Sequence, residues 1–371
     1  MQQIYLDYNA STPIAPEVKA AMLPYLEEYY GNPSALHFAG VKGKMAVEHA
    51  RTQVATMLNC SAHEVIFTSG GSESNNHVLK GVFHTYKDKG NHIITTKIEH
   101  PAILNPCHYL EKLGAKITYV DVDEYGRVNP QEVEQAITDQ TILLSVMHAN
   151  NEVGTIQPIE EIGRIARKHN VLFHTDASQS VGKVPLDVNL LNVDFLTIAG
   201  HKVYAPKGVG ALYIRQGIEI EPLMHGAGHE SGRRAGTENV LLVVGLGQAC
   251  ELAHKNSIEN EGIQKLRDYF WQQLQKQPHL NISLNGHPTL RLPNTLNVNF
   301  EYRIGQEILN ALPQIAASTG SACHAGEVNL SPVLKAMGVK ESIGMGAIRF
   351  SLGRYTTKQE IDAALQLIYQ L

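Results

Sequence analysis

The chain has 371 residues, 43% of them hydrophobic, which is enough to bury a sizeable core and suggests two or three domains. A formal charge of -5 at pH 7, with no Lys/Arg block, argues against nucleic acid as a direct ligand. The start, MQQIYLDYNASTP, lacks signal-peptide features, and no apolar run is long enough to span a membrane. We therefore expect a cytoplasmic protein that acts on small molecules.

Between residues 60 and 215, short β-rich runs alternate with helical patterns, as in α/β domains with a largely parallel sheet. Helical patterns at 72–88 and 159–170 are expected to be crossover helices, the second with isoleucines along one face. The predicted strands are 64–69, 92–97, 116–122, 141–148, 171–176, 194–199 and 210–215. Seven strands predict one large sheet.

The elements after residue 215 predict a smaller α+β domain. A long helical pattern covers about 239–277, and the last helix starts at a possible capping box formed by Thr357 and Glu360. Between them lie two strand-like runs and a helix-like run, at 295–300, 347–352 and 305–314. We place the large domain at 14–255 and the small domain at 1–13 and 256–371.

Polar residues follow several strands, and ligands of open parallel sheets bind at these carboxyl ends. After the first strand, Gly70 and Gly71 allow close backbone approach, and Ser72 opens a helix whose free N–H groups suit a phosphate. An ordinary turn would have the same sequence. His100, before Pro101, is either a helix cap or a ring available to a ligand.

The later strands end in residues with more specific chemistry. Asp176 either caps the next helix or holds a protonated ring nitrogen, and Gln179 lies close behind it. Lys202 follows a buried-type strand among glycines, and a desolvated lysine becomes the nucleophilic amine that a Schiff base requires. A phosphate cradle, a stacking ring, an acid and an amine together match the needs of pyridoxal phosphate.

Ordered motifs along essentially the whole chain resemble those of the cysteine desulfurases, pyridoxal-phosphate enzymes of the class V aminotransferase fold. They include YLDYNASTP, FTSGGSESNN, EHPAI, MHANNEVGTIQP, HTDASQSVGK, AGHKVYAPKGVGALYIR, HESGRRAGTENV, GSACHAG and IRFSLGR. The resemblance implies the α/β fold type I of these enzymes, with a large cofactor domain and a smaller α+β domain.

The resemblance also implies how the cofactor is held. Lys202 would carry the covalent link, Asp176 would pair with the pyridine nitrogen, Gln179 would contact the ring hydroxyl, and His100 would stack on the ring. The residues implied for the phosphate are Gly71, Ser72 and His201, joined by the partner subunit's Thr237 in a homodimer. Family members often have serine at the position of Ala199, so one phosphate hydroxyl is missing here and backbone N–H groups would replace it.

For the substrate, the resemblance implies that Asn151, near the cofactor, and Arg349 bind the carboxylate of L-cysteine. Lys202 would then act as the base at Cα. Cys323 would accept the sulfur as a persulfide, releasing L-alanine, and His324 is a possible neighbour that assists its ionisation.

The setting of Cys323 fits this role, because a run of small residues predicts an exposed and mobile loop. That run includes Gly320, Ala325 and Gly326. The remaining cysteines are widely spaced, without a C-x-x-C pair, so they predict neither a metal site nor a disulfide framework. We interpret Cys60, Cys107 and Cys250 as reduced structural thiols.

Several alternatives stay open at the level of sequence. The run SACHAG also resembles selenocysteine lyases, which would convert L-selenocysteine to L-alanine and selenide. A non-catalytic sulfur carrier would need only Cys323, and an aminotransferase of the same fold would not need it. The persulfide would pass to an acceptor protein, as in iron-sulfur cluster assembly, although the sequence ends with LQLIYQL, without the extension used to dock a scaffold.

Overall fold

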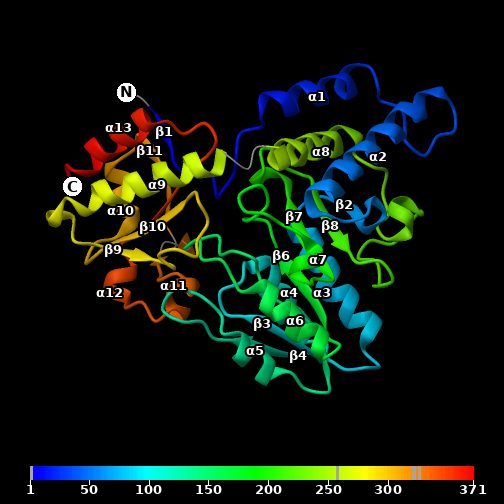
Figure 1. Cartoon of the computed structure of the whole chain (residues 1–371), viewed down its shortest axis with the longest axis horizontal. Helices are drawn as coiled ribbons and strands as arrows, with labels where there is room; N and C mark the ends of the chain where they lie inside the picture. Colours follow the sequence, from blue (N-terminus) through cyan, green and yellow to red (C-terminus); the bar gives the residue numbers. More distant parts are fainter. Residues whose placement is uncertain (1–2, 256–258, 320–322, 325–326) are drawn as a thin grey trace.

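The computed structural model describes residues 3–255, 259–319, 323–324 and 327–371, and Figure 1 shows these residues arranged in two lobes. The larger lobe holds the seven-stranded sheet and the helices that cover it, and the smaller lobe holds both ends of the described chain. No helix among the described residues is both long enough and apolar enough to cross a membrane.

The large sheet contains all seven predicted strands, in the order β2-β8-β7-β6-β5-β3-β4. The strands from β7 to β4 in this order are parallel, whereas β8 is antiparallel to both β2 and β7. Their bounds are β2 Val65–Thr68, β3 His92–Thr96, β4 Lys116–Val120, β5 Thr141–Ser145, β6 Leu172–Asp176, β7 Phe195–Ala199 and β8 Gly210–Ile214. The prediction of a mostly parallel α/β sheet is therefore confirmed.

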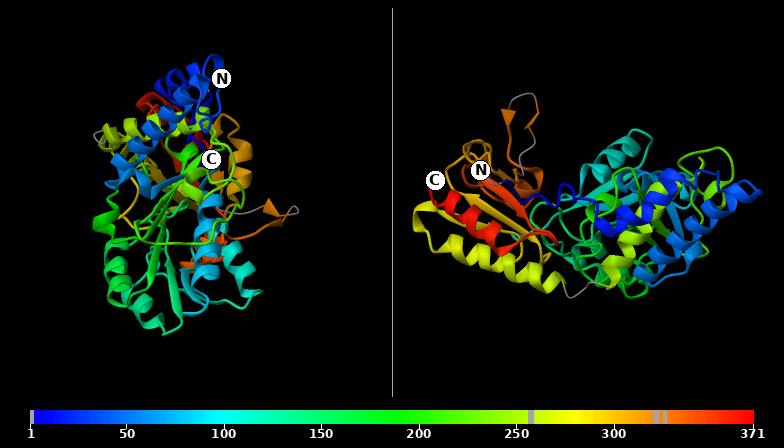
Figure 2. Two further views of the ribbon diagram at one scale, coloured as in Figure 1. Left: turned by 90° about the vertical axis from the view of Figure 1, so that its right-hand side faces the viewer. Right: turned by 90° about the horizontal axis from the view of Figure 1, so that it is seen from above.

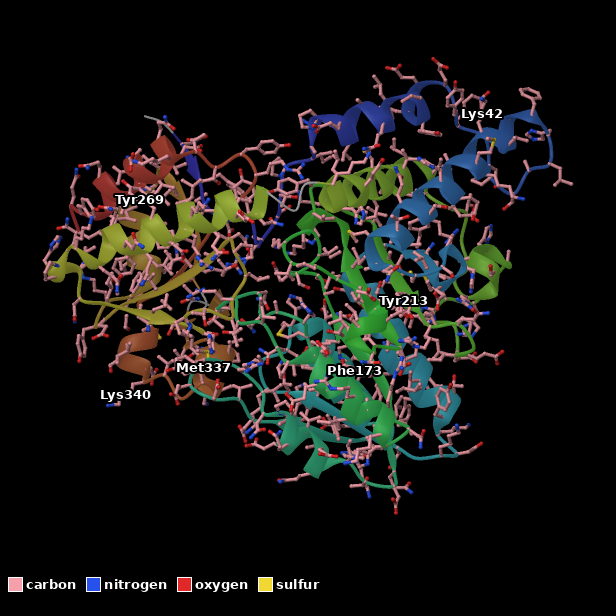
Figure 3. All side chains as sticks on the ribbon, viewed as in Figure 1. Lys42, Phe173, Tyr213, Tyr269, Met337 and Lys340 are labelled. Atoms are coloured by element: carbon pink, nitrogen blue, oxygen red, sulfur yellow. The ribbon has the colours of Figure 1, made fainter. Side chains whose placement is uncertain are left out.

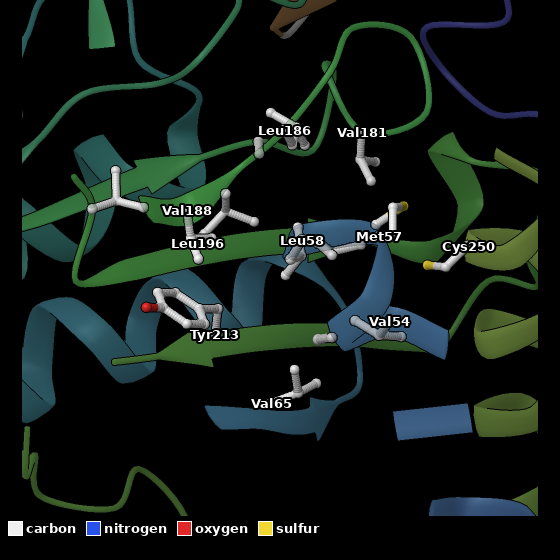
Figure 4. Packing of buried hydrophobic residues seen from close by; sticks show 14 of the residues in the cluster. Val54, Met57, Leu58, Val65, Val181, Leu186, Val188, Leu196, Tyr213 and Cys250 are labelled. Atoms are coloured by element: carbon white, nitrogen blue, oxygen red, sulfur yellow. The ribbon is translucent and has the colours of Figure 1, made fainter. Parts of the chain in front are cut away.

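Apolar helix faces cover both sides of this sheet. Helix α6 buries Ile159, Ile162 and Ala166, as its sequence periodicity predicts. On the face in Figure 4, Val54 and Leu58 of α2 pack with Leu196 and Tyr213 of the sheet. The helices are α1 Pro16–Glu27, α2 Phe38–Leu58, α3 Gly71–Tyr86, α4 Pro101–Glu111, α5 Pro130–Ala136, α6 Ile159–Lys168, α7 Val188–Leu191 and α8 Val240–Lys255, with short 3-10 helices η1 Ala62–Glu64, η2 Gly200–Lys202 and η3 His229–Gly232.

The smaller lobe is built on an antiparallel sheet in the order β12-β15-β10-β9. Helix α9 (Glu259–Gln275) and helix α13 (Lys358–Ile368) pack together, and the capping box of Thr357 and Glu360 opens α13 as predicted. The pattern at 239–277 forms two helices, α8 and α9, on either side of residues 256–258. The other elements are β1 Ile4–Tyr5, β9 Ile282–Asn285, β10 Thr295–Phe300, α10 Gly305–Ala311, β11 Ile315–Ala316, β12 Ser318–Thr319, α11 Pro332–Ala336, α12 Glu341–Gly344, β15 Ala347–Ser351 and η4 Pro278–Leu280.

Separate hydrophobic cores support the proposed domain boundaries. Ile4 and Leu6 pack in the small core with Phe270, whereas Ala15 packs in the large core with Cys250. Figure 3 shows Tyr269 in the small lobe and Phe173 and Tyr213 in the large one. A further cluster, which includes Met337, Ile98 and Met147, joins the two lobes. On this basis we propose domains at 14–255 and at 1–13 with 256–371.

A two-stranded hairpin carries the backbone of Cys323. Its strands are β13 (Cys323–His324) and β14 (Glu327–Val328), with Cys323 opposite Val328. Figure 2 shows this hairpin standing out from the small lobe. The side chains of these strands, and Gly320, Ala325 and Gly326, lie outside the described part of the structure.

Candidate active site

A cavity of about 410 Å³ lies where the large sheet meets the small lobe. Most of the residues that the sequence singled out for the site line its wall, and Thr237 does not. The predicted residues that line it are Gly71, Ser72, His100, Asn151, Asp176, Gln179, His201, Lys202 and Arg349. Residues that are far apart in the sequence thus meet at one site, as expected for the carboxyl ends of parallel strands.

Lys202 reaches this cavity from η2, directly after β7. Its Nζ donates to the carbonyl oxygens of Asn9 at 2.7 Å and Ala10 at 2.8 Å. Burial and the nearby charge of Arg349 outweigh the opposing carboxylates of Asp7 and Asp176, and together they lower the Lys202 pKa to about 8. Lys202 therefore supplies a neutral, nucleophilic amine at a much lower pH than an exposed lysine.

Asp176, the last residue of β6, has both carboxylate oxygens fixed by hydrogen bonds. Asn75 Nδ2 of α3 donates to Oδ2 at 2.7 Å, and the backbone N–H of Ser178 donates to Oδ1 at 2.9 Å. Sequence reasoning missed Asn75 and Ser178, although both fall within motifs that it quoted. An anchored acceptor of this kind suits a protonated ring nitrogen.

Space and donors for an anionic group lie at the start of α3. A side chain at Gly71 would bring its Cβ to 3.0 Å from Ser178 Oγ, so the absence of a side chain keeps this corner open. His201 has a buried Nδ1 with no partner among the described residues. Burial, with help from nearby lysines, lowers the His201 pKa to about 4, so the ring is neutral and can donate one N–H. These features fit a phosphate.

Arg349 projects from β15 with its guanidinium held by two groups. Its Nη1 donates to the carbonyl oxygen of Asn151 at 3.0 Å, and its Nη2 donates to Asp7 Oδ1 at 2.8 Å. Its Nε is buried without a partner in the described chain. Asp7, which also accepts from Ser318 Oγ, was missed from the sequence, where only its place in YLDYNASTP marked it.

His100 and Gln179 also line the cavity. His100 is the N-cap of α4, and its Nδ1 accepts from the Ala102 N–H at 3.1 Å, so it is a helix cap that also lines the cavity. Burial lowers the His100 pKa, which favours an uncharged ring. Gln179 donates from Nε2 to the Asn9 carbonyl at 3.0 Å and accepts from Lys183 Nζ at 3.2 Å.

The other predicted residues lie elsewhere. Thr237 is exposed and lies outside the cavity wall of its own chain. Cys107 and Cys250 are buried and Cys60 is half-buried, and burial raises each thiol pKa to about 12. These three cysteines therefore stay protonated and are poor nucleophiles, in line with the interpretation that they are structural.

No cluster of metal-ligating side chains occurs within the described ranges.

The seven-stranded sheet, the lysine beside its end, the anchored Asp176 and the anion corner define a pyridoxal-phosphate fold. The sequence model of the class V aminotransferases matches residues 4–364, and the chain belongs to this family. Its members use pyridoxal phosphate, and the donors and the open corner described above fit that cofactor.

Full-length similarities identify the branch of the family. The chain is 48% identical over 373 residues to the cysteine desulfurase IscS of Dictyoglomus turgidum, covering 100% of this chain and 94% of the relative. A solved NifS-like protein superposes with a TM-score of 0.94 at 40% identity, covering 100% and 99% of the two chains. SspA in complex with cysteine gives a TM-score of 0.82 at 37% identity, covering 95% of this chain and 100% of SspA. The chain is therefore a cysteine desulfurase, as its motifs predict.

Proposed function

We propose that the protein transfers sulfur from L-cysteine to Cys323 with the help of pyridoxal phosphate, releasing L-alanine and leaving a persulfide. The observation that carries this proposal is the meeting of Lys202, Asp176 and Arg349 at one cavity. A bound cysteine in the similar SspA structure supports the choice of substrate. Lys202 and Asp176 also argue against a non-catalytic sulfur carrier.

Different residues of the cavity would contact different parts of the cofactor. The pyridoxal phosphate, when bound, withdraws electrons from the substrate Cα. Lys202 provides the amine for the covalent link, and Asp176 keeps the ring nitrogen protonated. The remaining contacts are assigned to His100 at the ring face, Gln179 at the ring hydroxyl, Asn151 beside the ring, and Gly71, Ser72 and His201 at the phosphate.

The substrate is oriented from the opposite wall. Arg349 binds its carboxylate, together with Asn151, because a guanidinium held at two nitrogens by the protein is already oriented. This orientation brings the Cα proton toward Lys202. The amine, whose pKa burial lowers to about 8, removes that proton as the general base.

Sulfur transfer then requires a thiolate. Cys323 attacks the substrate sulfur, an S–S bond forms, and the C–S bond breaks with its electron pair left on the carbon skeleton. That skeleton takes up a proton and leaves as L-alanine, while Cys323 keeps the sulfur as a persulfide. An acceptor protein, as in iron-sulfur cluster assembly, then removes the sulfur in the reducing cytoplasm.

The active form is proposed to be a homodimer in which the partner subunit's Thr237 completes the phosphate site. Large apolar side chains of α1, of α2 and of the segment between them are exposed, with Leu36 of that segment at 97% and Phe38 of α2 at 89%, which is typical of a surface that another protein covers. Sedimentation should show a dimer that Phe38→Asp weakens. A fully active monomer would contradict the proposal.

The central experiment follows both products. Purified protein loaded with pyridoxal phosphate should convert L-cysteine to L-alanine, and peptide mass spectrometry should find one added sulfur on Cys323. L-selenocysteine, assayed in parallel, tests the alternative of a selenocysteine lyase. Turnover of L-selenocysteine without turnover of L-cysteine would reverse the assignment.

A further inference from the structure

Two serine hydroxyls fix the two ends of the segment that carries Cys323. At one end, Ser318 of β12 donates from Oγ to both carboxylate oxygens of Asp7, at 2.9 Å each. At the other end, Ser331, the N-cap of α11, donates from Oγ to Glu152 Oε2 at 2.7 Å. The Asp7 carboxylate is ion-paired with Arg349, and a hydroxyl bond to such a group is stronger than a bond between neutral groups. Burial raises the Glu152 pKa to about 7, so the Ser331 contact is an effective anchor because it is buried, not because its acceptor is fully charged.

Both anchors connect to Arg349. The Asp7 carboxylate that accepts from Ser318 also accepts from Arg349 Nη2 at 2.8 Å. Asn151, the residue before Glu152, offers its carbonyl oxygen to Arg349 Nη1 at 3.0 Å. Ser318 also lies directly opposite Arg349 in the pairing of β12 with β15. The guanidinium thus lies between the two anchored ends of the segment.

The anchor at Ser331 is deeply buried. Ser331 is 1% exposed and Glu152 is 7% exposed, and Glu152 Oε1 has no partner among the described residues. The Glu152 backbone carbonyl is held separately by Asn297 Nδ2 at 3.1 Å. Removing the Ser331 hydroxyl would leave a buried carboxyl group without a side-chain partner, which makes the loss of this contact costly.

The anchor at Ser318 limits where the thiol can go. Cys323 is five residues from Ser318, and five residues of fully extended chain span at most about 18 Å. A chain end fixed beside Arg349 therefore keeps Cys323 within about this distance of the group that holds the substrate carboxylate. Because β12 pairs with β15 over only two residues, the hydroxyl bond reinforces a short strand, and its loss would loosen this end and lower the effective concentration of the thiol at the substrate.

We propose that Ser318 and Ser331 are positioning residues that fix the Cys323 segment, through Asp7 and Glu152, beside the arginine that binds the substrate. This inference rests on the proposed roles of Cys323 and Arg349. It adds a specific assignment to them: the hydroxyls of Ser318 and Ser331 serve sulfur transfer, whereas the Asp7 carboxylate also holds Arg349 for substrate binding.

The test separates these two stages in the loaded enzyme. Ser318→Ala and Ser331→Ala should each lower L-alanine formation from L-cysteine about tenfold or more, the effect of leaving a carboxyl group inside the protein without its hydroxyl partner. The absorbance change on adding L-cysteine should persist, because it does not need Cys323. Ser318→Thr keeps the hydroxyl and should restore turnover, and Ser342→Ala, an exposed serine of α12, is the matched control.

A second measurement does not depend on turnover. The rate at which iodoacetamide alkylates Cys323 should change in Ser318→Ala and Ser331→Ala but not in Ser342→Ala. Unchanged turnover and alkylation in both serine variants, beside an inactive Cys323→Ala, would overturn this inference and leave the proposed function standing. Full turnover by Cys323→Ala would instead overturn the proposed function and this inference with it. If Ser331→Ala does not fold, the comparison of Ser318→Ala with Ser318→Thr tests the inference without it.

Discussion

The large-domain wall of the cavity and the segment around Cys323 differ in how much regular structure supports them. On the wall, Lys202 and Asp176 stand at the ends of β7 and β6, two strands in the middle of the large sheet, and hydrogen bonds hold their polar atoms. Around Cys323, the strands β12, β13 and β14 have two residues each. Under the proposed mechanism, the groups that act at Cα are held in place, and the proposed sulfur acceptor lies on a short anchored segment.

This division has a chemical reason. Proton removal at Cα needs an amine within hydrogen-bonding distance of one atom, and fixed geometry serves that need. A persulfide must first form at an enclosed substrate and then meet an outside acceptor. A residue in the wall cannot do both, so a substitution in either region should affect mainly the step that this region serves.

Removing the amine from the wall should give the largest effect. Lys202→Ala should abolish the covalent cofactor link and lower turnover by a factor on the order of 10⁴, because both the link and the base are lost. Borohydride reduction followed by peptide mapping should place the label of the wild-type enzyme on Lys202. Lys97→Ala, at an exposed lysine paired with Asp121, is the control and should retain both properties. A label on another lysine would remove Lys202 from its role.

Removing the thiol from the segment should affect only sulfur transfer. Cys323→Ala should keep the yellow colour and the absorbance change with L-cysteine, yet lose L-alanine formation by about 10³ or more. Cleavage of L-selenocysteine should fall far less, because selenolate is the better leaving group. Cys60→Ala, which removes a half-buried thiol whose pKa burial raises to about 12, should behave as wild type. Equal losses on both substrates would mean that Cys323 also serves the steps at Cα.

Arg349 joins the two regions, and its replacement should act on substrate binding. Arg349→Lys keeps the charge but cannot reach both the Asn151 carbonyl and Asp7. We expect the KM for L-cysteine to rise about 10- to 100-fold, the equivalent of one or two lost bonds to a charged group. Steady-state kinetics measures this change. An unchanged KM would show that the carboxylate binds elsewhere.

The pH dependence of cofactor loading tests the lowered pKa of Lys202, independently of the Cys323 segment. Burial lowers the Lys202 pKa to about 8, and only the neutral amine forms the covalent link. In protein stripped of cofactor, the linking rate should rise about tenfold per pH unit below pH 8 and level off above it. Stopped-flow absorbance records this rate. A rise that continues to pH 10 would indicate an unperturbed lysine.

The smallest effect is expected far from both regions. Thr357→Ala removes the N-cap bond to the Glu360 N–H in α13 and should destabilise the protein by about 1 kcal/mol. Thermal unfolding should begin a few degrees lower, with turnover per folded molecule unchanged. A drop in kcat would show that the small domain is coupled to the chemistry beyond its anchors.

The local features of this chain could be predicted because neighbouring residues encode them. The seven strands of the large sheet follow from β-rich runs with turn signals at their ends, and the α13 cap follows from Thr357 and Glu360. Lys202 and Asp176 stood out because they follow strands, at the edge of the sheet where ligands bind, and because an amine and a carboxylate have specific chemistry there. The order of the motifs along the chain then indicated the cysteine desulfurase family, which the comparisons confirm.

Only the tertiary structure brought in Asp7, Asn75, Ser318, Ser331 and Glu152. Each has an ordinary residue type for its local sequence, and each matters through a partner at long range, such as Asp7 with Arg349 or Ser331 with Glu152. The antiparallel placement of β8 between β2 and β7 was equally invisible, because a buried strand has the same pattern in either direction. Local sequence determines which segments form and which groups can react, and the packing of distant segments decides which of those groups meet.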